Sequence, residues 1–508
     1  MPGRQPRHLV VAGNGMAGFR LVQEVLAADL DRRLVITVAG AEPGGAYNRI
    51  QLSHLLAGHC PADSIELAGP GWYRANGVRL RAPATVTRID RPARLAWLDD
   101  GSVLPYDVLV LATGADPVLP PVDGLAGPHG RLLPGAVPFR TRADCAAIDR
   151  LARDAASAVV LGGGVLGLEA ARALAGRGLP VTLVQRGRQL MERDLDAAAA
   201  AVLGRTVRGL GVRVHRGAGI AAVLGGTRLH AVRLDDGTVL DADLLVLCCG
   251  VRPRTDLARA AGLAVGTGVV VDDQLRSSDP SIFAIGDCAE HRGRGYGLVA
   301  PAWEQAKVAA WGIARPSDLA SYPGSVPVTR LKAAGVELAC LGEAALTEDE
   351  ADDAGGGASG ATASDVEVVR FTDSARGVYQ KLVVRSGQLA GAILLGDTAA
   401  AGTLAQLFDR GSALPADRAA LLLGRTGGAA AGVSPTRLPG RATICHCNGV
   451  SKAAICAAWE SGARRPAEIA AVTRATTGCG MCRDAVEGIV DWLSAADAEP
   501  EEGAGHAA

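Results

Sequence analysis

The sequence has few aromatic residues and no long apolar run. Phe, Trp and Tyr make up only 3% of its 508 residues, which leaves little material for a surface that stacks the bases of single-stranded nucleic acid. Lys and Arg (52) balance Asp and Glu (53), so charge gives no reason to expect nucleic acid or an anionic membrane as a partner. No run of about 18 apolar residues is present, which argues against a membrane-spanning helix.

Cysteine is also sparse, whereas glycine is abundant. Eleven cysteines in 508 residues are too few for a disulfide scaffold, and the apolar run that stops at residue 12 is too short for a signal peptide. We therefore expect a cytoplasmic protein whose grouped cysteines serve metal or redox chemistry. The 66 glycines show no collagen-like period, so they must serve turns, close backbone approaches and linkers.

Two halves of the first 250 residues repeat one pattern. An apolar strand runs into a glycine-rich stretch at 13–18, and another runs into a similar stretch at 162–167. Each half later has Asp-Asp-Gly and then an apolar strand that stops at a glycine, Gly114 in the first half and Gly250 in the second. Two copies of a nucleotide-binding unit explain the repeat. The sequence therefore predicts an α/β fold with two interleaved Rossmann-like domains.

The first glycine motif, G-x-G-x-x-G at 13–18, follows an expected strand and precedes an expected helix. Its glycines let the backbone approach a pyrophosphate, which then lies at the amino terminus of the helix. Glu42 follows the next expected strand, where an acid that binds a ribose hydroxyl belongs. Gly286 and Asp287 follow a later strand and would add a phosphate or ribityl contact, although Gly-Asp alone is more often only a turn.

The second glycine motif, at 162–167, is followed by Glu169 on the expected helix. The next expected strand ends in Gln185, Arg186 and Arg188 rather than in an acid. An acid would bind the ribose 2′-hydroxyl of NADH, whereas arginines would accommodate the 2′-phosphate of NADPH. Both donors stay open, because the two arginines could equally be solvated. The presence of two dinucleotide-binding motifs in one chain is explained if one binds FAD and the other binds NAD(P)H.

Four cysteines form two closely spaced pairs near the carboxyl terminus. Cys445 and Cys447 make a C-x-C pair, and Cys479 and Cys482 make a C-x2-C pair. Four thiolates suit a tetrahedral zinc site and equally a 2Fe-2S cluster. The cluster is favoured, because C-x-C is less usual for zinc and because a flavin in the same chain needs an acceptor. The other cysteines form no C-x4-C or C-x2-C pair, which disfavours thiol reduction.

The motifs together carry a family resemblance. The first 315 or so residues resemble the two-dinucleotide-binding flavoprotein reductases, and residues 441–495 resemble the bacterioferritin-associated-ferredoxin-like 2Fe-2S domain. Stretches at 43–53, 190–196, 303–307, 324–327 and 391–397 resemble the NAD(P)H-dependent assimilatory nitrite reductase large subunit and the related nitrate reductase electron-transfer subunit.

The resemblance implies a set of cofactor-binding residues. Contacts to FAD and NAD(P)H are implied for Gly13, Asn14, Gly15, Met16, Ala17, Gly18, Glu42, Arg49, Ser53, Val86, Ala112, Thr113, Gly114, Gly162, Gly164, Val165, Leu166, Gly167, Glu169, Gln185, Arg186, Gly250, Gly286, Asp287 and Glu304. The 2Fe-2S ligands are implied to be Cys445, Cys447, Cys479 and Cys482. No catalytic acid or base is assigned, because hydride transfer to a flavin requires none.

Two departures from the family pattern sharpen the expected function. The nitrite reductase large subunit binds sirohaem and a 4Fe-4S group through C-x5-C and C-x3-C pairs, and no unassigned cysteines here have that spacing. We therefore expect that this chain does not reduce nitrite itself. His54 stands where many flavin reductases with this motif place a lysine beside the flavin, so its role stays open.

The expected function is electron delivery. NAD(P)H would give a hydride to FAD, which would pass single electrons through the 2Fe-2S cluster to a partner. The resemblance implies the catalytic subunit of a molybdenum-dependent assimilatory nitrate reductase as that partner. A separate sirohaem nitrite reductase is the alternative acceptor, and a redox-sensing flavoprotein or a zinc-stabilised interaction module is an alternative of another class. A homodimer is one option for the oligomeric state.

The order of motifs predicts four domains. The FAD-binding domain is expected at 1–140 and 255–320, the NAD(P)-binding domain at 141–254, an α+β domain at 321–423, a linker at 424–440, and the small helical 2Fe-2S domain at 441–495. The tail at 496–508 is expected to be disordered, and the stretch at 348–365 to be a mobile loop.

Overall fold

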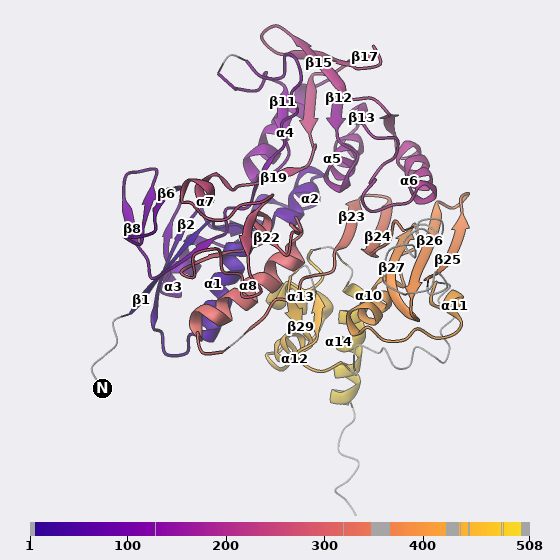
Figure 1. The fold of residues 1–508 in the computed structure, drawn as a ribbon. Helices are drawn as coiled ribbons and strands as arrows, with labels where there is room; N and C mark the ends of the chain where they lie inside the picture. Colours follow the sequence, from indigo (N-terminus) through magenta and orange to yellow (C-terminus); the bar gives the residue numbers. More distant parts are fainter. Residues whose placement is uncertain are drawn as a thin grey trace, which may run out of the picture. The chain divides into compact units, whose positions relative to one another are not determined.

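The computed structural model describes residues 6–127, 129–318, 320–346, 366–422, 436, 438–445, 448–478, 480 and 482–498. The predicted mobile loop at 348–365 and most of the predicted linker and tail lie outside these residues. The chain divides into two compact units, one of residues 1–188 and 211–327 and the other of residues 189–210 and 328–508. Figure 1 labels the elements along the chain.

The first unit is built around a parallel sheet with the strand order β21-β9-β1-β2-β5. Its strands are β1 (Arg7–Ala12), β2 (Leu34–Ala39), β5 (Arg79–Arg81), β9 (Val108–Leu111) and β21 (Ile282–Ala284). Every neighbouring pair runs parallel. The strands β9 and β21 are buried throughout, which is why they read as unbroken apolar runs. The helices α1 (Met16–Ala28) and α8 (Val299–Ala314) lie side by side and share the sheet's core (Figure 1).

A second parallel sheet in the same unit repeats this plan, with the strand order β11-β18-β12-β13-β14. Its strands are β11 (Ala136–Pro138), β12 (Ala158–Leu161), β13 (Val181–Gln185), β14 (Val212–Arg216) and β18 (Leu244–Leu247). The strand β12 takes the central place that β1 has in the first sheet, and it is followed by α5 (Val165–Gly176) as β1 is followed by α1. The prediction of two Rossmann-like units is confirmed.

Two antiparallel sheets of three strands extend the repeat. One contains β6 (Val86–Asp90), β7 (Leu95–Leu98) and β8 (Val103–Pro105), and the other contains β15 (Ile220–Gly225), β16 (Leu229–Leu234) and β17 (Val239–Asp241). The two Asp-Asp-Gly turns lie between β7 and β8 and between β16 and β17, where Gly101 and Gly237 have φ of 81° and 87°. Such left-handed values favour glycine.

Shorter elements lie between the strands of the two parallel sheets along the chain. They are β3 (Ala46–Tyr47), α2 (Leu52–Leu56), β4 (Glu66–Ala68), α3 (Pro70–Ala75), β10 (Ala115–Pro117), α4 (Arg142–Asp154), β19 (Val251–Pro253), α7 (Asp256–Ala260), β20 (Val269–Val271) and β22 (Ala289–His291). The crossover strands β10 and β19 pair antiparallel, so the chain passes from one dinucleotide domain to the other and back through adjacent strands.

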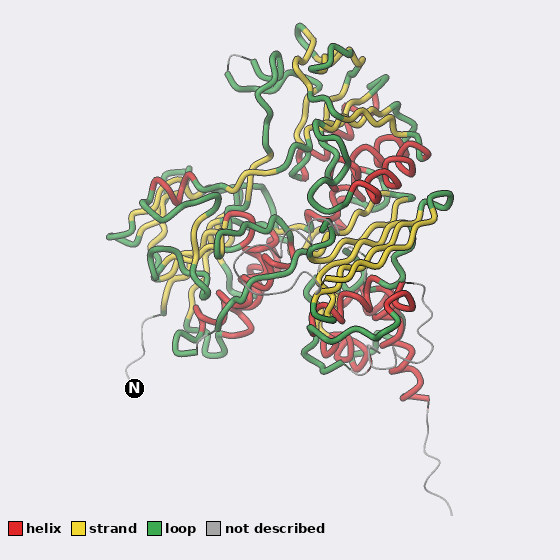
Figure 2. Tube along the Cα trace, turned by 45° about the vertical axis from the view of Figure 1, so that its right-hand side comes forward, coloured by secondary structure: helices red, strands yellow, loops and turns green. Residues whose placement is uncertain are grey.

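The second unit contains an antiparallel sheet with the order β23-β24-β27-β26-β25. Its strands are β23 (Val328–Ala333), β24 (Val336–Gly342), β25 (Val366–Asp373), β26 (Val378–Arg385) and β27 (Gln388–Leu395), drawn in yellow in Figure 2. The helices α10 (Ala401–Arg410) and α11 (Arg418–Leu422) bury their apolar residues in its core. The helix α6 (Ala197–Gly209) also belongs to this unit, although it lies between β13 and β14 in the sequence.

A small helical segment with one short hairpin follows in the second unit. It consists of β28 (Thr443–Cys445), β29 (Val450–Ser451), α12 (Lys452–Glu460), α13 (Pro466–Thr473) and α14 (Arg483–Ala498). Ser451 begins α12 by accepting a hydrogen bond from the backbone N–H of Ala454, the usual role of serine at this position. Among the described residues, we find no helix whose length and apolar character would let it span a bilayer.

Candidate functional site

The loop at 13–18 joins the central strand β1 to α1, and its three glycines have different tasks. A Cβ on Gly13 would lie 2.1 Å from the carbonyl oxygen of Ala112, and a Cβ on Gly18 would lie 2.1 Å from that of Gly13. A Cβ on Gly15 would meet no atom within 4 Å. Gly15 precedes α1 without a side-chain cap. The outer glycines therefore close the turn, and the middle one leaves the helix amino terminus open to an anion.

The loop at 162–167 has the same geometry between β12 and α5. A Cβ on Gly162 would lie 2.2 Å from the carbonyl oxygen of Cys248, and one on Gly167 would lie 1.8 Å from that of Gly162. Gly164 has open space within 4 Å and precedes α5 without a side-chain cap. Neither α1 nor α5 has an acidic residue in its first turn. Both helix ends thus fit the pyrophosphate of a dinucleotide.

Two further predicted loops lie at the same edge of the first sheet as loop 13–18, because β9 and β21 run parallel to β1. Residues 112–114 follow β9, and Gly114 has a φ of 73°. Gly286 follows β21 with a φ of 75°, and its Cβ would lie 2.9 Å from the Cβ of Ala17. Asp287 forms an ion pair of 2.5 Å with Arg140. Sequence reasoning missed Arg140, because nothing local links two residues 147 positions apart.

The acid predicted to bind a ribose hydroxyl is part of a small network. Glu42 accepts a hydrogen bond of 2.7 Å from the Tyr47 hydroxyl and forms an ion pair with Arg49. Burial raises the pKa of Tyr47, which keeps its hydroxyl protonated as a donor. Arg49 also donates to the backbone oxygen of Arg140 at 3.0 Å. The structure therefore brings Glu42 and Arg49 together, which were predicted separately.

Several buried side-chain polar atoms lack a hydrogen-bond partner among the described residues, and two of them belong to α8 and α2. The indole Nε1 of Trp303 is one, and its ring packs with Met16 of loop 13–18 and with Ala302. The hydroxyl of Ser53, on α2, is the other. Buried polar groups are normally hydrogen-bonded, so these atoms fit a site that is completed by a polar cofactor such as FAD.

The structure also places four other predicted contact residues of the first unit. The Tyr73 hydroxyl donates to Asn14 Oδ1 at 2.7 Å, and burial raises the pKa of Tyr73 to about 12. Val86 begins β6 and is buried. The hydroxyl of Thr113 donates to the backbone oxygen of Arg254 at 3.2 Å. Glu304 accepts a hydrogen bond from the Ser325 hydroxyl.

The predicted nicotinamide side of the site is formed by the end of β13 and the second glycine loop. Gln185 Oε1 accepts a hydrogen bond of 2.7 Å from the N–H of Gly163, so its side chain stabilises the loop. Arg186 lies next to Gly219, whose Cβ would be 3.5 Å from Arg186 Cδ. Glu169 is buried on α5. Gly250 has a φ of 95° with open space around its Cβ position.

The adjacent cysteines after β18 are packing residues. Cys248 lies against the glycine loop, with its Cβ 3.5 Å from the position of a Cβ on Gly162. Burial raises the pKa of Cys249 to about 11 and raises the pKa of Cys248 as well. Because the thiolate is the reactive form, neither thiol is activated at neutral pH.

The described part of the cysteine-rich segment holds two of the four predicted cluster ligands. Cys445 at the end of β28 and Cys482 before α14 are both buried. The backbone N–H of Thr476 donates to Cys482 Sγ at 3.2 Å, an arrangement that stabilises a sulfur carrying negative charge. Cys447 and Cys479 lie outside the described residues.

One amide side chain connects the two cysteine-bearing loops. Asn448, next to the C-x-C pair, donates through Nδ2 to the backbone oxygen of Arg474 at 2.7 Å and to the Thr477 hydroxyl at 3.3 Å. Arg474 and Thr477 lie five and two positions before the C-x2-C pair. The loops are therefore held together by protein contacts, which fits four cysteines that converge on one metal centre.

Comparison with known families gives a match that includes both glycine loops. The family described as pyridine nucleotide-disulphide oxidoreductase matches residues 7–310. The chain belongs to this family. A rubredoxin NAD+ reductase C-terminal domain matches residues 327–412, and a BFD-like 2Fe-2S binding domain matches residues 443–492.

Curated relatives match nearly the whole chain. A nitrite reductase (NAD(P)H) from Bacillus subtilis is 35% identical over 495 residues, which cover 97% of this chain and 58% of the relative. An assimilatory nitrate reductase electron transfer subunit from the same organism is 34% identical, with 96% of this chain and 60% of the relative covered. The chain thus spans about three fifths of the length of these relatives.

Solved structures show the same fold. The ferredoxin reductase for the CYP199A2 system from Rhodopseudomonas palustris aligns with a TM-score of 0.67 and 27% identity, covering 77% of this chain and 92% of that one. The covalent putidaredoxin reductase–putidaredoxin complex aligns with a TM-score of 0.71 and 25% identity, covering 84% and 100%.

These matches confirm the predicted enzyme class and cofactors. The chain is an NAD(P)H-dependent oxidoreductase that uses FAD and carries a 2Fe-2S domain. The resemblance to the nitrite and nitrate reductase proteins is also confirmed. The roles of the individual site residues stay predictions.

Proposed function

We propose that this chain takes electrons from NAD(P)H and delivers them, through FAD and a 2Fe-2S cluster, to a catalytic partner in nitrate assimilation. The observation that carries the proposal is the combination, in one chain, of two open helix termini with two buried cysteines in a segment that matches a 2Fe-2S binding domain. A relative that matches 96% of this chain bears the name of a nitrate reductase electron transfer subunit, which supports the proposed direction of electron flow.

The proposed roles divide the site residues between two dinucleotides. Loops 13–18, 112–114 and 286–287 would hold FAD, and loop 162–167 with Gln185, Arg186 and Gly250 would hold NAD(P)H. The bound flavin would supply the conversion of a two-electron hydride donor into single electrons for a cluster held by the cysteine pairs. The chain contributes binding and orientation, and the Arg140–Asp287 ion pair fixes the carboxylate that follows β21.

The end of β13 supports NADPH as an accepted donor. Gln185 replaces the acid that would bind a ribose 2′-hydroxyl, and its oxygen already accepts the N–H of Gly163. Arg186 follows it directly and supplies a positive charge suited to a 2′-phosphate. We therefore propose that NADPH is used at least as well as NADH.

The proposed acceptor is the catalytic subunit of an assimilatory nitrate reductase, with a separate sirohaem nitrite reductase as the alternative. Both proposals agree with the sequence, whose cysteines provide no C-x5-C and C-x3-C pairs for sirohaem. A cytoplasmic location is proposed as well, because grouped cysteines that serve metal or redox chemistry suit a reducing compartment.

The proposed domain division follows the strand pairings. The first sheet supports an FAD-binding domain at 1–140 and 255–320, and the second supports an NAD(P)-binding domain around 141–254. The strand β11 at 136–138 pairs with β18 of the second sheet, so we propose to place the first boundary before residue 136. The α+β domain at 321–423 and the 2Fe-2S domain at 441–495 complete the division.

An anaerobic titration with NADH and NADPH, followed by absorbance and electron paramagnetic resonance, tests the proposal. We expect bleaching of the flavin and then the signal of a reduced 2Fe-2S cluster. The Cys482→Ser variant should keep flavin bleaching and lose the cluster signal, whereas the control Cys456→Ser, on α12, should behave as the wild type. A purified protein with stoichiometric zinc and only a flavin spectrum would refute the proposal. Transfer to purified nitrate or sirohaem nitrite reductase then distinguishes the two acceptors.

A further inference from the structure

A cavity of about 370 Å³ lies at the amino ends of β1, β9 and β21. The dinucleotide loops follow the carboxyl ends of the same strands. Because β1 has six residues and a strand rises about 3.3 Å per residue, the two edges are about 20 Å apart. The cavity is therefore separate from the redox site, and its volume is that of a small-molecule site.

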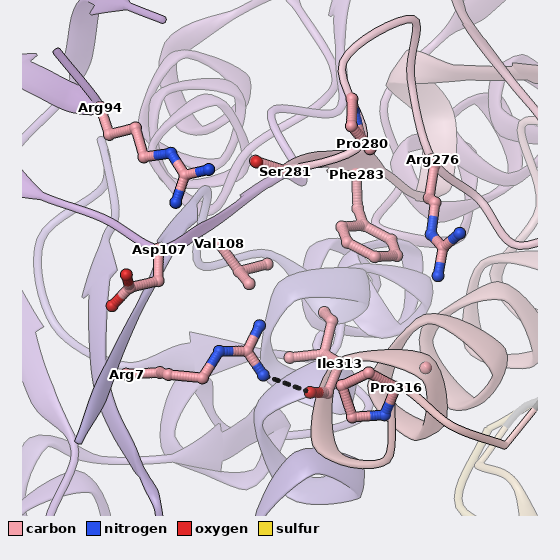
Figure 3. Close-up of a pocket in the computed structure, with 11 residues that line it drawn as sticks. Arg7, Arg94, Asp107, Val108, Arg276, Pro280, Ser281, Phe283, Ile313 and Pro316 are labelled. Atoms are coloured by element: carbon pink, nitrogen blue, oxygen red, sulfur yellow. Dashed lines mark hydrogen bonds between the residues drawn. The ribbon is translucent and has the colours of Figure 1, made fainter. Parts of the chain in front are cut away.

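Three arginines from different elements line this cavity. Arg7 begins β1, Arg94 lies in the turn between β6 and β7, and Arg276 precedes β21. Figure 3 shows their side chains around one opening, with Arg7 and Arg94 on one side and Arg276 on the other. Arg7 and Arg276 are half-buried. Within the described residues, none of the three forms an ion pair with a carboxylate.

Three arginines against the single carboxylate of Asp107 give the lining of the cavity a net positive charge, so this arrangement favours an anion. The last turn of α8 also lines the cavity, and its carbonyl groups carry partial negative charge. Arg7 offsets this effect, because its Nη1 donates to the backbone oxygen of Ile313 at 3.3 Å. Arg94 and Arg276 are then the two guanidinium groups that remain for a ligand.

Part of the cavity lining is apolar and aromatic. Phe283 and Val108 form this part, and the guanidinium of Arg276 lies over the Phe283 ring, 6.0 Å from its centroid. A planar group can pack against such a wall. Asp107 also lines the cavity, held by the backbone N–H of His8, which donates to its Oδ2 at 2.7 Å. A carboxylate in this position can accept hydrogen bonds from ligand hydroxyls.

We propose that this cavity binds a nucleoside monophosphate. Arg94 and Arg276 contact the phosphate, for which the guanidinium fork is well suited. The Phe283 wall takes the base, and Asp107 accepts hydrogen bonds from the sugar hydroxyls. The site is independent of the proposed electron-transfer function.

Calorimetric titration of the full-length holoprotein with UMP tests this proposal. Saturation with FAD and NADP+ fills the dinucleotide sites beforehand, so that UMP reports on the new site. We expect UMP to bind, and uridine and inorganic phosphate to bind at least roughly tenfold more weakly, because each lacks half of the contacts. Affinity for UMP should fall by roughly tenfold or more in Arg94→Gln and further in Arg94→Gln/Arg276→Gln.

The control variant is Arg88→Gln, which removes a charge from the exposed face of β6 outside the cavity. It should bind UMP as the wild type does. Because Arg94 is exposed, the single variant should keep its FAD content and circular dichroism spectrum. Failure of UMP to bind at millimolar concentration would overturn the proposal. So would unchanged affinity in the folded double variant, equal weakening by Arg88→Gln, or inorganic phosphate binding as tightly as UMP.

Discussion

The middle glycines of the two loops offer a test of which dinucleotide each loop binds. In Gly15→Ala and Gly164→Ala the new methyl group would meet no protein atom within 4 Å. Gly15 has φ −78° and ψ −171°, and Gly164 has φ −82° and ψ −176°, which alanine adopts freely. Both variants should therefore fold normally, and the methyl group should obstruct only the pyrophosphate that lies against the helix amino terminus.

The size of the effect follows from the contacts that the methyl group would displace. A hydrogen bond from a backbone N–H to a charged phosphate contributes about 1.5–3 kcal/mol. Loss of one such bond corresponds to roughly a 10- to 150-fold change in dissociation constant. Gly15→Ala should thus lose FAD on dilution, with an unchanged KM for NAD(P)H once FAD is restored. Gly164→Ala should retain FAD, and its KM for NAD(P)H should rise by roughly 10- to 150-fold.

The assay is FAD content by absorbance together with steady-state dye reduction at saturating FAD. The matched control is Gly176→Ala at the end of α5, where a Cβ also meets no atom within 4 Å, and it should change neither quantity. Gly18→Ala should instead destabilise the fold, since its Cβ would lie 2.1 Å from the Gly13 carbonyl oxygen. If Gly15→Ala raised the KM for NAD(P)H and kept FAD, the assignment of the two loops would be wrong.

Three other outcomes follow from the described contacts. Lys381 is fully buried and pairs with Asp196 at 2.9 Å. Lys381→Met should therefore lower the free energy of unfolding, measured in urea, by about 3–5 kcal/mol. A loss of less than about 1 kcal/mol would contradict the role of this pair. Burial would raise the pKa of Asp196, but hydrogen bonds from a backbone N–H, Lys381 and Tyr379 lower it. The resulting stability should be present above about pH 4 and lost as pH falls through the lowered pKa, and urea unfolding of wild type and Asp196→Asn between pH 7 and 3 should converge. Arg186→Glu should lower kcat/KM for NADPH by roughly tenfold or more relative to NADH, and an unchanged ratio would remove Arg186 from the donor site.

Most of the predictions about the cofactors rest on short sequence motifs. A glycine loop can be recognised from a short stretch of sequence, because consecutive residues form both its turn and the amino terminus of the following helix. The two cysteine pairs are equally local, although their convergence is not. The repeat of strand, loop and helix extended this local information to the architecture. Four neighbouring strands follow the same order in both sheets, β9-β1-β2-β5 and β18-β12-β13-β14, whereas the edge strands β21 and β11 do not correspond.

Contacts between distant residues could not be predicted in the same way. The partner of Asp287 is Arg140, and the partner of Lys381 is Asp196, 185 positions away. The sequence gives no sign that α6 belongs to the unit of the antiparallel sheet. The stretch at 190–196 has a family-like pattern, yet only the structure shows that Asp196 both caps α6 and meets a buried lysine.

The sequence by itself determined the two dinucleotide loops, the cysteine pairs and the doubly repeated α/β plan, because each depends on the spacing of neighbouring residues. Only the tertiary structure decided how the polar side chains pair and which arginines meet in one cavity. Arg7, Arg94 and Arg276 line one cavity although they are scattered over 270 positions. Arg7 and Arg276 meet there because β1 and β21 begin at one edge of a parallel sheet, and the turn between β6 and β7 adds Arg94. Strand order is set by packing of the whole domain, so it brings together side chains that no local pattern connects.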